Sequence, residues 1–325
     1  MRAVVIDEHG GPEVLHYREH PEPVPGPGEA LVAVTAAGLN FIDTYHRTGL
    51  YPVQLPLVLG NEGAGTVVAA AEDVESVATG DRVAFSQVLS GSYADLAAVR
   101  AAELVRVPDG VDLEVAAAAM LQGMTAHYLC TSTFPLDEGD VCLIHAGAGG
   151  VGLLLTQMAK LRGATVIATA GSDEKVALSR RAGADHVINY DDVDFGDAVE
   201  EIAGPKAVDV VYDGVGRTTV ERGLDLLRPR GMMVSFGNAS GPPAPIDPLV
   251  LASKGSLFLT RPSLPHYLAT REELEWRAGD LLGWIEQGAV EVRIGARFAL
   301  SDAADAHRAL EGRATTGKVI LIQPS

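Results

Sequence analysis

Cysteine is scarce in this sequence: only two, Cys130 and Cys142, occur in 325 residues. Two thiols are too few for a structural zinc site of four cysteines or for a disulfide framework. Both lie in apolar stretches, where buried and unreactive thiols are common, and a disulfide between them is disfavoured in a reducing cytosol. The sequence therefore predicts a fold held together by its hydrophobic core.

Positive charge and long apolar runs are also lacking. Lys and Arg number 25 against 43 Asp and Glu, which gives a net charge of −18, so phosphate backbones and anionic lipids are repelled. No stretch approaches the roughly 18 apolar residues of a membrane span. The first residues reach an acidic pair and Gly-Gly before a signal-peptide core can form. We expect no nucleic-acid partner, no membrane span and a cytoplasmic location.

Two kinds of local pattern follow each other along the chain, whose length suggests about two domains. The first part has short strands between Gly and Pro turns, which is typical of a compact β-rich unit. The expected strands are RAVVI, ALVAVTAAG, GAGTVVAA, DRVAF and LVRVP. The Ala-rich stretch of residues 112–134 then predicts helices that bridge two domains.

From Val141 onward, strands and helices alternate. The runs VCLIHA, TVIATA, HVINY, VDVVYD and MMVSF are separated by helical segments, which predicts a parallel sheet with helices on both faces. A further strand, GSLFLTRP, is followed by a helix and a final strand–helix–strand unit. We therefore predict an α/β protein in which a doubly wound domain, residues 123–260, is inserted into a β-rich domain of residues 1–122 and 261–325.

A glycine-rich turn after VCLIH predicts nucleotide binding. Gly147, Gly149 and Gly152 complete the pattern G-x-G-x-x-G directly after a strand and at the start of an apolar helix. The first glycine permits the tight turn, the second lets the backbone approach a pyrophosphate, and the third lets helix and strand pack closely. The helix N-terminus then offers N–H groups and the positive end of its dipole to the phosphates.

The end of the next strand indicates which dinucleotide is bound. NAD enzymes place Asp or Glu there to hold the ribose 2′-OH, whereas this strand ends in Ala-Gly-Ser, residues 170–172. That end leaves room for a 2′-phosphate, to which Ser172 donates a hydrogen bond and Lys175 supplies charge. Asp173 supports the rival NAD interpretation, and Lys175 is alternatively a solvated helix residue. Tyr190 closes the adenosine pocket or is simply a strand-end aromatic residue.

Eight blocks spread over essentially the whole chain resemble, in order and spacing, those of the zinc-independent quinone oxidoreductases related to zeta-crystallin, within the medium-chain dehydrogenase/reductase superfamily. The blocks are AAGLNFIDTYHRTGLYP, LQGMTAHYL, HAGAGGVG, VINY, VYDGVG, MVSFGNASG, LTRPSL and RATTGKVIL. The resemblance implies a GroES-like β-rich domain, a Rossmann domain, NADPH as the cofactor and a homodimer.

The same resemblance bears on zinc. Zinc-bearing relatives carry Cys in the segment that here reads Leu39-Asn40, and His in a Gly-His-Glu motif that here reads Gly60-Asn61-Glu62. Amide side chains offer neither the thiolate nor the imidazole of a catalytic zinc site. We expect no metal.

Roles for individual residues also follow from the resemblance. Asn40, Tyr45 and Tyr51 resemble polar residues lining the active-site cleft, which Arg261 borders. Contacts to the cofactor are implied for Thr125, Gly147, Gly149, Gly150, Val151, Gly152, Gly171, Ser172, Lys175, Tyr190, Phe236, Gly237, Asn238, Arg313, Gly317 and Lys318. Each polar group has a structural alternative: Asn40 caps a turn, the tyrosines pack, Arg261 lies on the surface, and Lys318 only begins the last strand.

These residues together predict an NADPH-dependent quinone reductase. Donors aimed at the quinone oxygen lower the barrier as negative charge develops there, and solvent supplies the final proton. A reductase of 2-alkenals, enones or enoyl thioesters with the same fold is the alternative, and a non-catalytic nucleotide-binding protein is the rival from another class. The strand at residues 255–260 reads as a sheet edge, so we expect a homodimer formed there.

Overall fold

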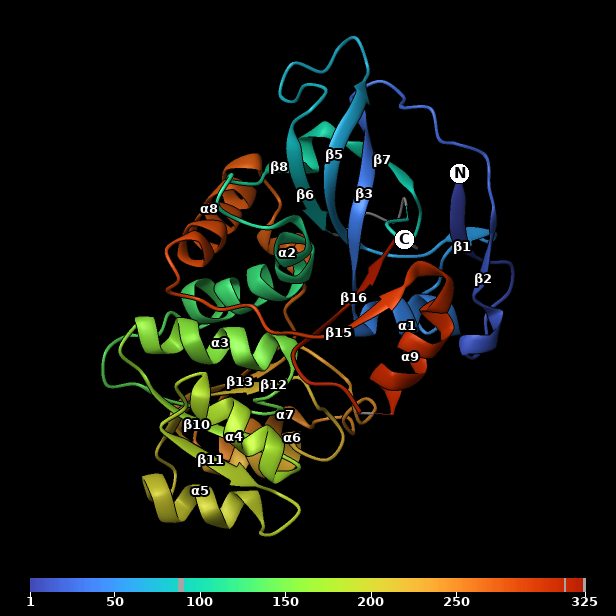
Figure 1. Ribbon diagram of the computed structural model, residues 1–325. Helices are drawn as coiled ribbons and strands as arrows, with labels where there is room; N and C mark the ends of the chain where they lie inside the picture. Colours follow the sequence, from blue (N-terminus) through green and yellow to red (C-terminus); the bar gives the residue numbers. More distant parts are fainter. Residues whose placement is uncertain (87–90, 313, 324–325) are drawn as a thin grey trace. The chain divides into compact units, whose positions relative to one another are not determined.

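The computed structural model, drawn in Figure 1, describes residues 1–86, 91–312 and 314–323. The chain divides into two compact units, one comprising Met1–Met124 with Leu268–Ser325 and the other Thr125–Tyr267. The C-terminal segment thus returns to the unit in which the chain begins. Within the described ranges, no helix is both long and apolar enough to cross a membrane.

The first unit is built mainly on antiparallel strands. In its described part, a sheet has the order β15-β16-β3-β5-β6-β8 with β7 paired to β3, and a smaller sheet has the order β2-β1-β4. The strands are β1 (Arg2–Ile6), β2 (His16–Glu19), β3 (Glu29–Leu39), β4 (Leu57–Val58), β5 (Glu62–Ala70), β6 (Arg82–Ser86), β7 (Leu96–Arg100), β8 (Val105–Arg106), β15 (Ile294–Ala299) and β16 (Lys318–Ile322). The five strands predicted from sequence are present, while β2, β4 and β7 were not expected.

Helices of this unit include one that the sequence did not predict. They are α1 (Phe41–Thr48), α2 (Leu113–Tyr128), α8 (Arg271–Glu286) and α9 (Ala303–Glu311). The unexpected helix α1 begins with a capping box, in which Asn40 and Asp43 each accept from the other's backbone N–H. It ends at Gly49, whose φ of 78° a side chain would disfavour.

Strand β16 joins the C-terminal segment to the body of the first unit. It pairs antiparallel with β3, with Val319 opposite Leu39 and Ile322 opposite Ala36. Val319 and Leu321 enter a buried cluster shared with β1, β3 and α9. This pairing attaches the last strand–helix–strand segment to the sheet of the first unit.

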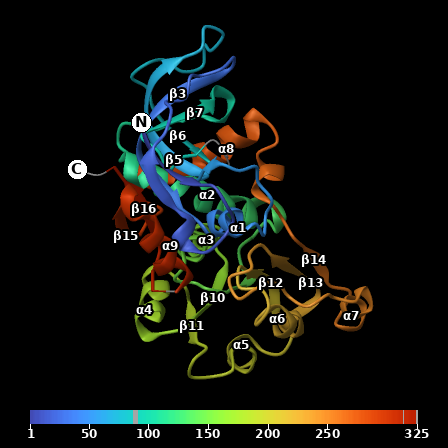
Figure 2. The same cartoon turned by 90° about the vertical axis from the view of Figure 1, so that its right-hand side faces the viewer.

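The second unit is a doubly wound parallel sheet. Its described strands have the order β11-β10-β9-β12-β13-β14, the order of a dinucleotide-binding Rossmann sheet. The strands are β9 (Val141–Ile144), β10 (Thr165–Ala170), β11 (His186–Asn189), β12 (Val208–Asp213), β13 (Leu227–Ser235) and β14 (Phe258–Thr260), and the helices are α3 (Gly150–Leu161), α4 (Asp173–Arg181), α5 (Phe195–Ala203), α6 (Val220–Leu226) and α7 (Pro248–Ser253). Helices α3 and α4 pack together against β10, and α5 and α6 pack together near β12 (Figure 2), as right-handed crossovers require.

The start of β13 differs from the sequence prediction. LRPRG was expected before the strand, but β13 begins at Leu227 and its pairing with β12 jumps from Leu227 to Met232. The intervening residues form a bulge in which Arg230 has a φ of 65°. A bulge of this kind has no period-2 pattern, so alternation of apolar residues does not reveal it.

A glycine in β5 allows a close approach of two strands in the first unit. A Cβ at Gly65 would lie 1.9 Å from the carbonyl oxygen of Ala33 in β3, so we expect Gly65→Ala to lower the free energy of unfolding by roughly 2 kcal/mol. Gly279→Ala is the control, because Gly279 in α8 is exposed and meets nothing within 4 Å. That change should be neutral or stabilising by up to about 1 kcal/mol. Urea unfolding of both variants checks this, and equal midpoints contradict it.

Candidate functional site

The glycine-rich turn of the second unit has the backbone shape that a phosphate requires. A Cβ at Gly147 would lie 2.8 Å from Ala168 Cβ, and one at Gly152 only 2.4 Å from the carbonyl oxygen of Ala146. Gly149 is the N-cap of α3 and has no side chain to accept from the first turn. The amides of that turn, which include Gly150 and Val151, are therefore open to an anionic ligand.

The end of β10 is shaped by a second glycine. A Cβ at Gly171 would lie 2.5 Å from the hydroxyl oxygen of Tyr190, so only glycine lets this ring lie across the strand end. Ser172 Oγ accepts from the backbone N–H of Lys175 and caps α4, at 3.3 Å, which leaves the Ser172 hydroxyl hydrogen available to a ligand. The Asp173 carboxylate accepts instead from Asn189 of β11, at 3.4 Å.

Most of the remaining predicted residues of the second unit follow the carboxyl ends of strands in its sheet, and one of them is the first residue of the unit. Arg261 follows β14 and donates to the carbonyl oxygen of Ser235, at 2.8 Å, beside the loop formed by Phe236, Gly237 and Asn238. A Cβ at Gly237 would lie 2.5 Å from the carbonyl oxygen of Gly214 after β12. Thr125, the first residue of the unit, is buried. Carboxyl ends of parallel strands are where ligands of such sheets bind.

In the first unit, two predicted residues meet at a buried ion pair. Lys318 Nζ contacts the Glu62 carboxylate and donates to Asn40 Oδ1 at 2.7 Å. Asn40 Nδ2 donates to Glu62 Oε2 at 2.8 Å and to the carbonyl oxygen of Gly38 at 3.2 Å. The side chains of Lys318 and Glu62 are 1% and 0% exposed. Burial lowers the pKa of Lys318, and the facing Glu62 opposes that shift.

This geometry changes the role of Asn40. Both hydrogens of its amide are directed at protein oxygens, so in this arrangement none is left for a substrate oxygen. We therefore revise its expected role from direct donor to positioning residue. The ammonium of Lys318 is likewise engaged by Glu62 and Asn40. Gly317 precedes it with a φ of 62°, and Arg313 lies outside the described residues.

Tyr45 and Tyr51 form a pair at the end of α1. Their ring centroids are 5.2 Å apart with the planes at 64°, and Gly49 makes the turn between them. Tyr51 is 37% exposed, so its ring does not pack into the core. Tyr51 therefore combines a ring contact to Tyr45 with a partly exposed side chain.

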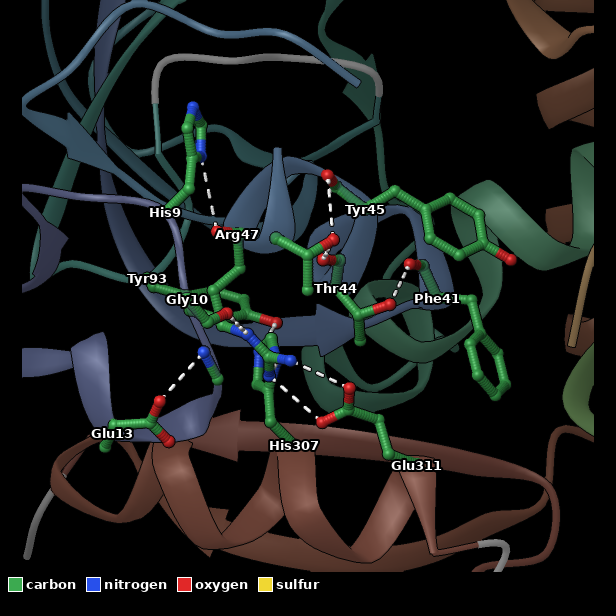
Figure 3. Close-up of polar contacts among 12 residues, drawn as sticks. His9, Gly10, Glu13, Phe41, Thr44, Tyr45, Arg47, Tyr93, His307 and Glu311 are labelled. Atoms are coloured by element: carbon green, nitrogen blue, oxygen red, sulfur yellow. Dashed lines mark hydrogen bonds and ion pairs between the residues drawn. The ribbon is translucent and has the colours of Figure 1, made fainter. Parts of the chain in front are cut away.

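Sequence reasoning missed a group of buried polar residues around α1. Arg47 binds Glu311 and His307 of α9 (Figure 3), and Asp43 accepts from Asn61 and Tyr93. Charged residues at core-facing positions of a helix were the available signal, since they are rarely buried without a partner. Their partners lie up to 264 residues away in sequence, and no local pattern identifies them.

Two family models match the chain. The first is described as "Alcohol dehydrogenase GroES-like domain" and covers residues 26–109. The second is described as "Zinc-binding dehydrogenase" and covers residues 150–274. The part of the chain that the structure describes contains no group of three or more His, Cys, Asp or Glu residues able to hold a metal ion.

Full-length similarity extends to named proteins and to a solved structure. The chain is 47% identical to a quinone oxidoreductase of Pseudomonas aeruginosa, with 97% of each chain covered, and 40% identical to a 2-haloacrylate reductase of a Burkholderia species, with 99% of each covered. A crystal structure of Escherichia coli quinone oxidoreductase complexed with NADPH superposes with a TM-score of 0.97 at 43% identity, over 99% of this chain and 100% of the other. The chain therefore belongs to the quinone oxidoreductases of the medium-chain dehydrogenase/reductase superfamily.

Proposed function

We propose that this protein is an NADPH-dependent quinone reductase that works without zinc. The observation that carries the proposal is similarity to quinone oxidoreductases along nearly the whole chain, 47% over 97% of it in one case. The donor set supports the absence of zinc, because Asn40 and Asn61 stand where zinc-bearing relatives have Cys and His, and amides are poor zinc ligands. The second unit binds the nucleotide, and the first contributes groups that face the acceptor.

The cofactor residues proposed in the second unit fit a phosphorylated dinucleotide. The turn of residues 147–152 fits the pyrophosphate at the N-terminus of α3. At the end of β10, the Ser172 hydroxyl and the Lys175 ammonium are the donors for a 2′-phosphate, since an ammonium and a hydroxyl both suit phosphate oxygens. Tyr190 borders the adenosine. NADPH supplies the reducing equivalents when bound.

The acceptor is polarised by hydroxyl groups of the first unit. Reduction places negative charge on the quinone oxygen, and preorganised donors lower the barrier most where that charge develops. We assign this role to Tyr45 and Tyr51, and propose the Arg261 guanidinium as a further donor. Asn40 acts indirectly, because its amide is held by Lys318 and Glu62. Solvent provides the final proton.

A reductase of activated alkenes is the second candidate. The relative named 2-haloacrylate reductase is 40% identical over 99% of this chain, and the same cofactor and hydroxyl donors suit an α,β-unsaturated acceptor such as a 2-alkenal, an enone or an enoyl thioester. Turnover of 1,4-naphthoquinone against a 2-alkenal, a 2-haloacrylate and an enoyl thioester separates the two proposals. Binding of NADPH without turnover of any acceptor supports a non-catalytic role instead.

Cofactor preference tests the role of Lys175. We expect NADPH to be oxidised at least about tenfold more efficiently than NADH with 1,4-naphthoquinone, since a charged hydrogen bond is worth roughly 1.5–3 kcal/mol. Lys175→Ala should raise KM for NADPH while leaving KM for NADH nearly unchanged. A chelator should leave both rates unchanged. An NADH preference in the wild type shows that Asp173, not Lys175, determines the choice.

Replacement of the tyrosines tests the proposed donors. Tyr45→Phe and Tyr51→Phe keep the ring contact and remove only the hydroxyl, so we expect kcat for quinone to fall by about tenfold or more. The Kd for NADPH, measured by fluorescence, should not change. Tyr17→Phe, in β2, is the control and should retain full kcat. Unchanged kcat in both site variants rules out the tyrosines as donors.

We also propose a homodimer formed through β14, and a cytoplasmic location. In the described part of the sheet, β14 is an edge strand beside β13, and it exposes Phe258 by 56% and Leu259 by 39%. A second copy pairing there would extend the sheet and cover these side chains. Both cysteines are buried and neither forms a disulfide in the described structure, which suits a reducing compartment.

Size-exclusion chromatography with light scattering measures the oligomeric state. We expect a mass of twice the 34.0 kDa chain. Phe258→Asp should shift the protein towards monomer, because a carboxylate would be buried at the interface. Val24→Asp is the control, since Val24 is 86% exposed in a loop and should not change the mass. A monomeric wild type refutes the dimer.

A further inference from the structure

A chain of polar groups runs from α9 to the inner side of α1 (Figure 3). The Arg47 guanidinium, in a side chain 1% exposed, makes hydrogen bonds of 2.7 and 3.1 Å to the Glu311 carboxylate. It also donates to His307 Nδ1 at 2.9 Å. Because a guanidinium only donates, the proton of neutral His307 lies on Nε2, which faces the Tyr93 hydroxyl at 3.5 Å.

The Asp43 carboxylate is the inner end of this chain. Tyr93 donates to Asp43 Oδ2 at 3.0 Å, the backbone N–H of Asn40 donates to the same oxygen at 2.8 Å, and Asn61 Nδ2 donates to Oδ1 at 2.7 Å. Asp43 is completely buried. Three donors from three different segments therefore converge on one side chain. An ionised carboxylate suits this position because both of its oxygens accept hydrogen bonds and neither donates.

From Asp43 the contacts continue to the tyrosine pair. The Asn61 amide nitrogen that donates to Asp43 also lies 3.1 Å from His46 Nδ1. The ring centroids of His46 and Tyr51 are 6.2 Å apart, and those of Tyr51 and Tyr45 are 5.2 Å apart. The orientation of Asn61, which Asp43 fixes, thus determines which nitrogen of His46 accepts and how that ring is held beside Tyr51.

We propose that Asp43 is a positioning residue of the reductase: its ionised carboxylate, acting through Asn61 and His46, holds Tyr51 and Tyr45 in the orientation used in turnover. The proposal rests on the proposed function, in which these tyrosines polarise the acceptor. Protonation of the Asp43 carboxylate removes an acceptor position that the three donors need. Tyr51 and Tyr45 then lose their fixed orientation.

The surroundings of Asp43 bring the pKa of its carboxyl group towards neutral pH. Burial raises the pKa of Asp43 to about 6, while its hydrogen bonds and the charge of Lys318 oppose the shift. Burial and then the charge of Arg47 lower the pKa of His307 to about 3, so this ring is neutral near pH 6. Burial also lowers the pKa of His46 below its usual value. Arg47 and the Lys318–Glu62 pair are the other charged groups that face this network.

The pH profile of kcat is the test. With saturating NADPH and naphthoquinone, we expect kcat of the wild type to fall as the pH drops below about 6, because the neutral carboxyl group then predominates. Asp43→Asn cannot ionise and should show a kcat lowered about tenfold or more with no acid limb, and an unchanged Kd for NADPH. Asp305→Asn, at an exposed carboxylate paired with Arg308, is the matched control and should keep the wild-type profile.

A second variant keeps the carboxylate. Tyr93→Phe removes one donor that lowers the pKa of Asp43, so the acid limb should move to higher pH by a measurable fraction of a unit. An acid limb that persists in Asp43→Asn, or one that Tyr93→Phe leaves in place, overturns the proposal. A wild type that reduces no acceptor at any pH refutes the proposed function instead, and the two failures are therefore distinguishable.

Discussion

The first unit depends on a buried pair of opposite charges, Lys318 of β16 and Glu62 of β5. Taking a single ion out of water costs several kcal/mol, and removal of one partner leaves the other uncompensated. The pair therefore requires that residues 256 positions apart in sequence meet whenever the unit folds. Asn40 hydrogen-bonds to both charges, so the same constraint fixes its side-chain amide. Asn40 is also the residue that caps α1.

Helix α1 shows why such constraints matter for the site. It has eight residues, a length at which an isolated helix is marginal in water, so tertiary contacts must hold it. The capping box with Asn40 and Asp43 fixes its start, and the ion pair of Arg47 with Glu311 fixes its last turn against α9. Tyr45 and the turn to Tyr51 are thereby attached to a segment anchored at both ends.

The second unit was more predictable from sequence than the first. Its strands are continuous apolar runs and its helices are separated by glycine turns, so local pattern alone indicates a doubly wound parallel sheet. The bulge at the start of β13 and helix α7 escaped prediction because neither has a regular apolar period. The site glycines Gly147, Gly152, Gly171 and Gly237 were predictable, since each stands where a Cβ would come closer than 3.0 Å to another atom.

The polar network of the first unit was not predictable in the same way. In the sequence, Glu62 and Asn61 mark only the place where zinc ligands are missing. Lys318 was expected there as a cofactor contact or as the start of the last strand, and not as the partner of Glu62. That Lys318 lies against Glu62 is a consequence of β16 pairing with β3, a register between segments at opposite ends of the chain. Local periodicity carries no information about such pairings, and a buried His307 or Arg47 cannot be recognised before its partners are known.

The network also explains how this site differs from one built on a metal. Where zinc-bearing relatives have a thiolate and an imidazole, this chain has two amides, and the positive charge near them is an ammonium neutralised by Glu62. A neutral pair exerts little net field at a distance, so it cannot replace a Lewis acid in polarising an acceptor. In the function proposed here, polarisation comes from hydroxyl donors, whose effect depends strongly on direction. In that proposal, Asp43, Asn61 and Asn40 set the direction of these donors, and this role would offset the cost of burying the Asp43 carboxylate beneath α1.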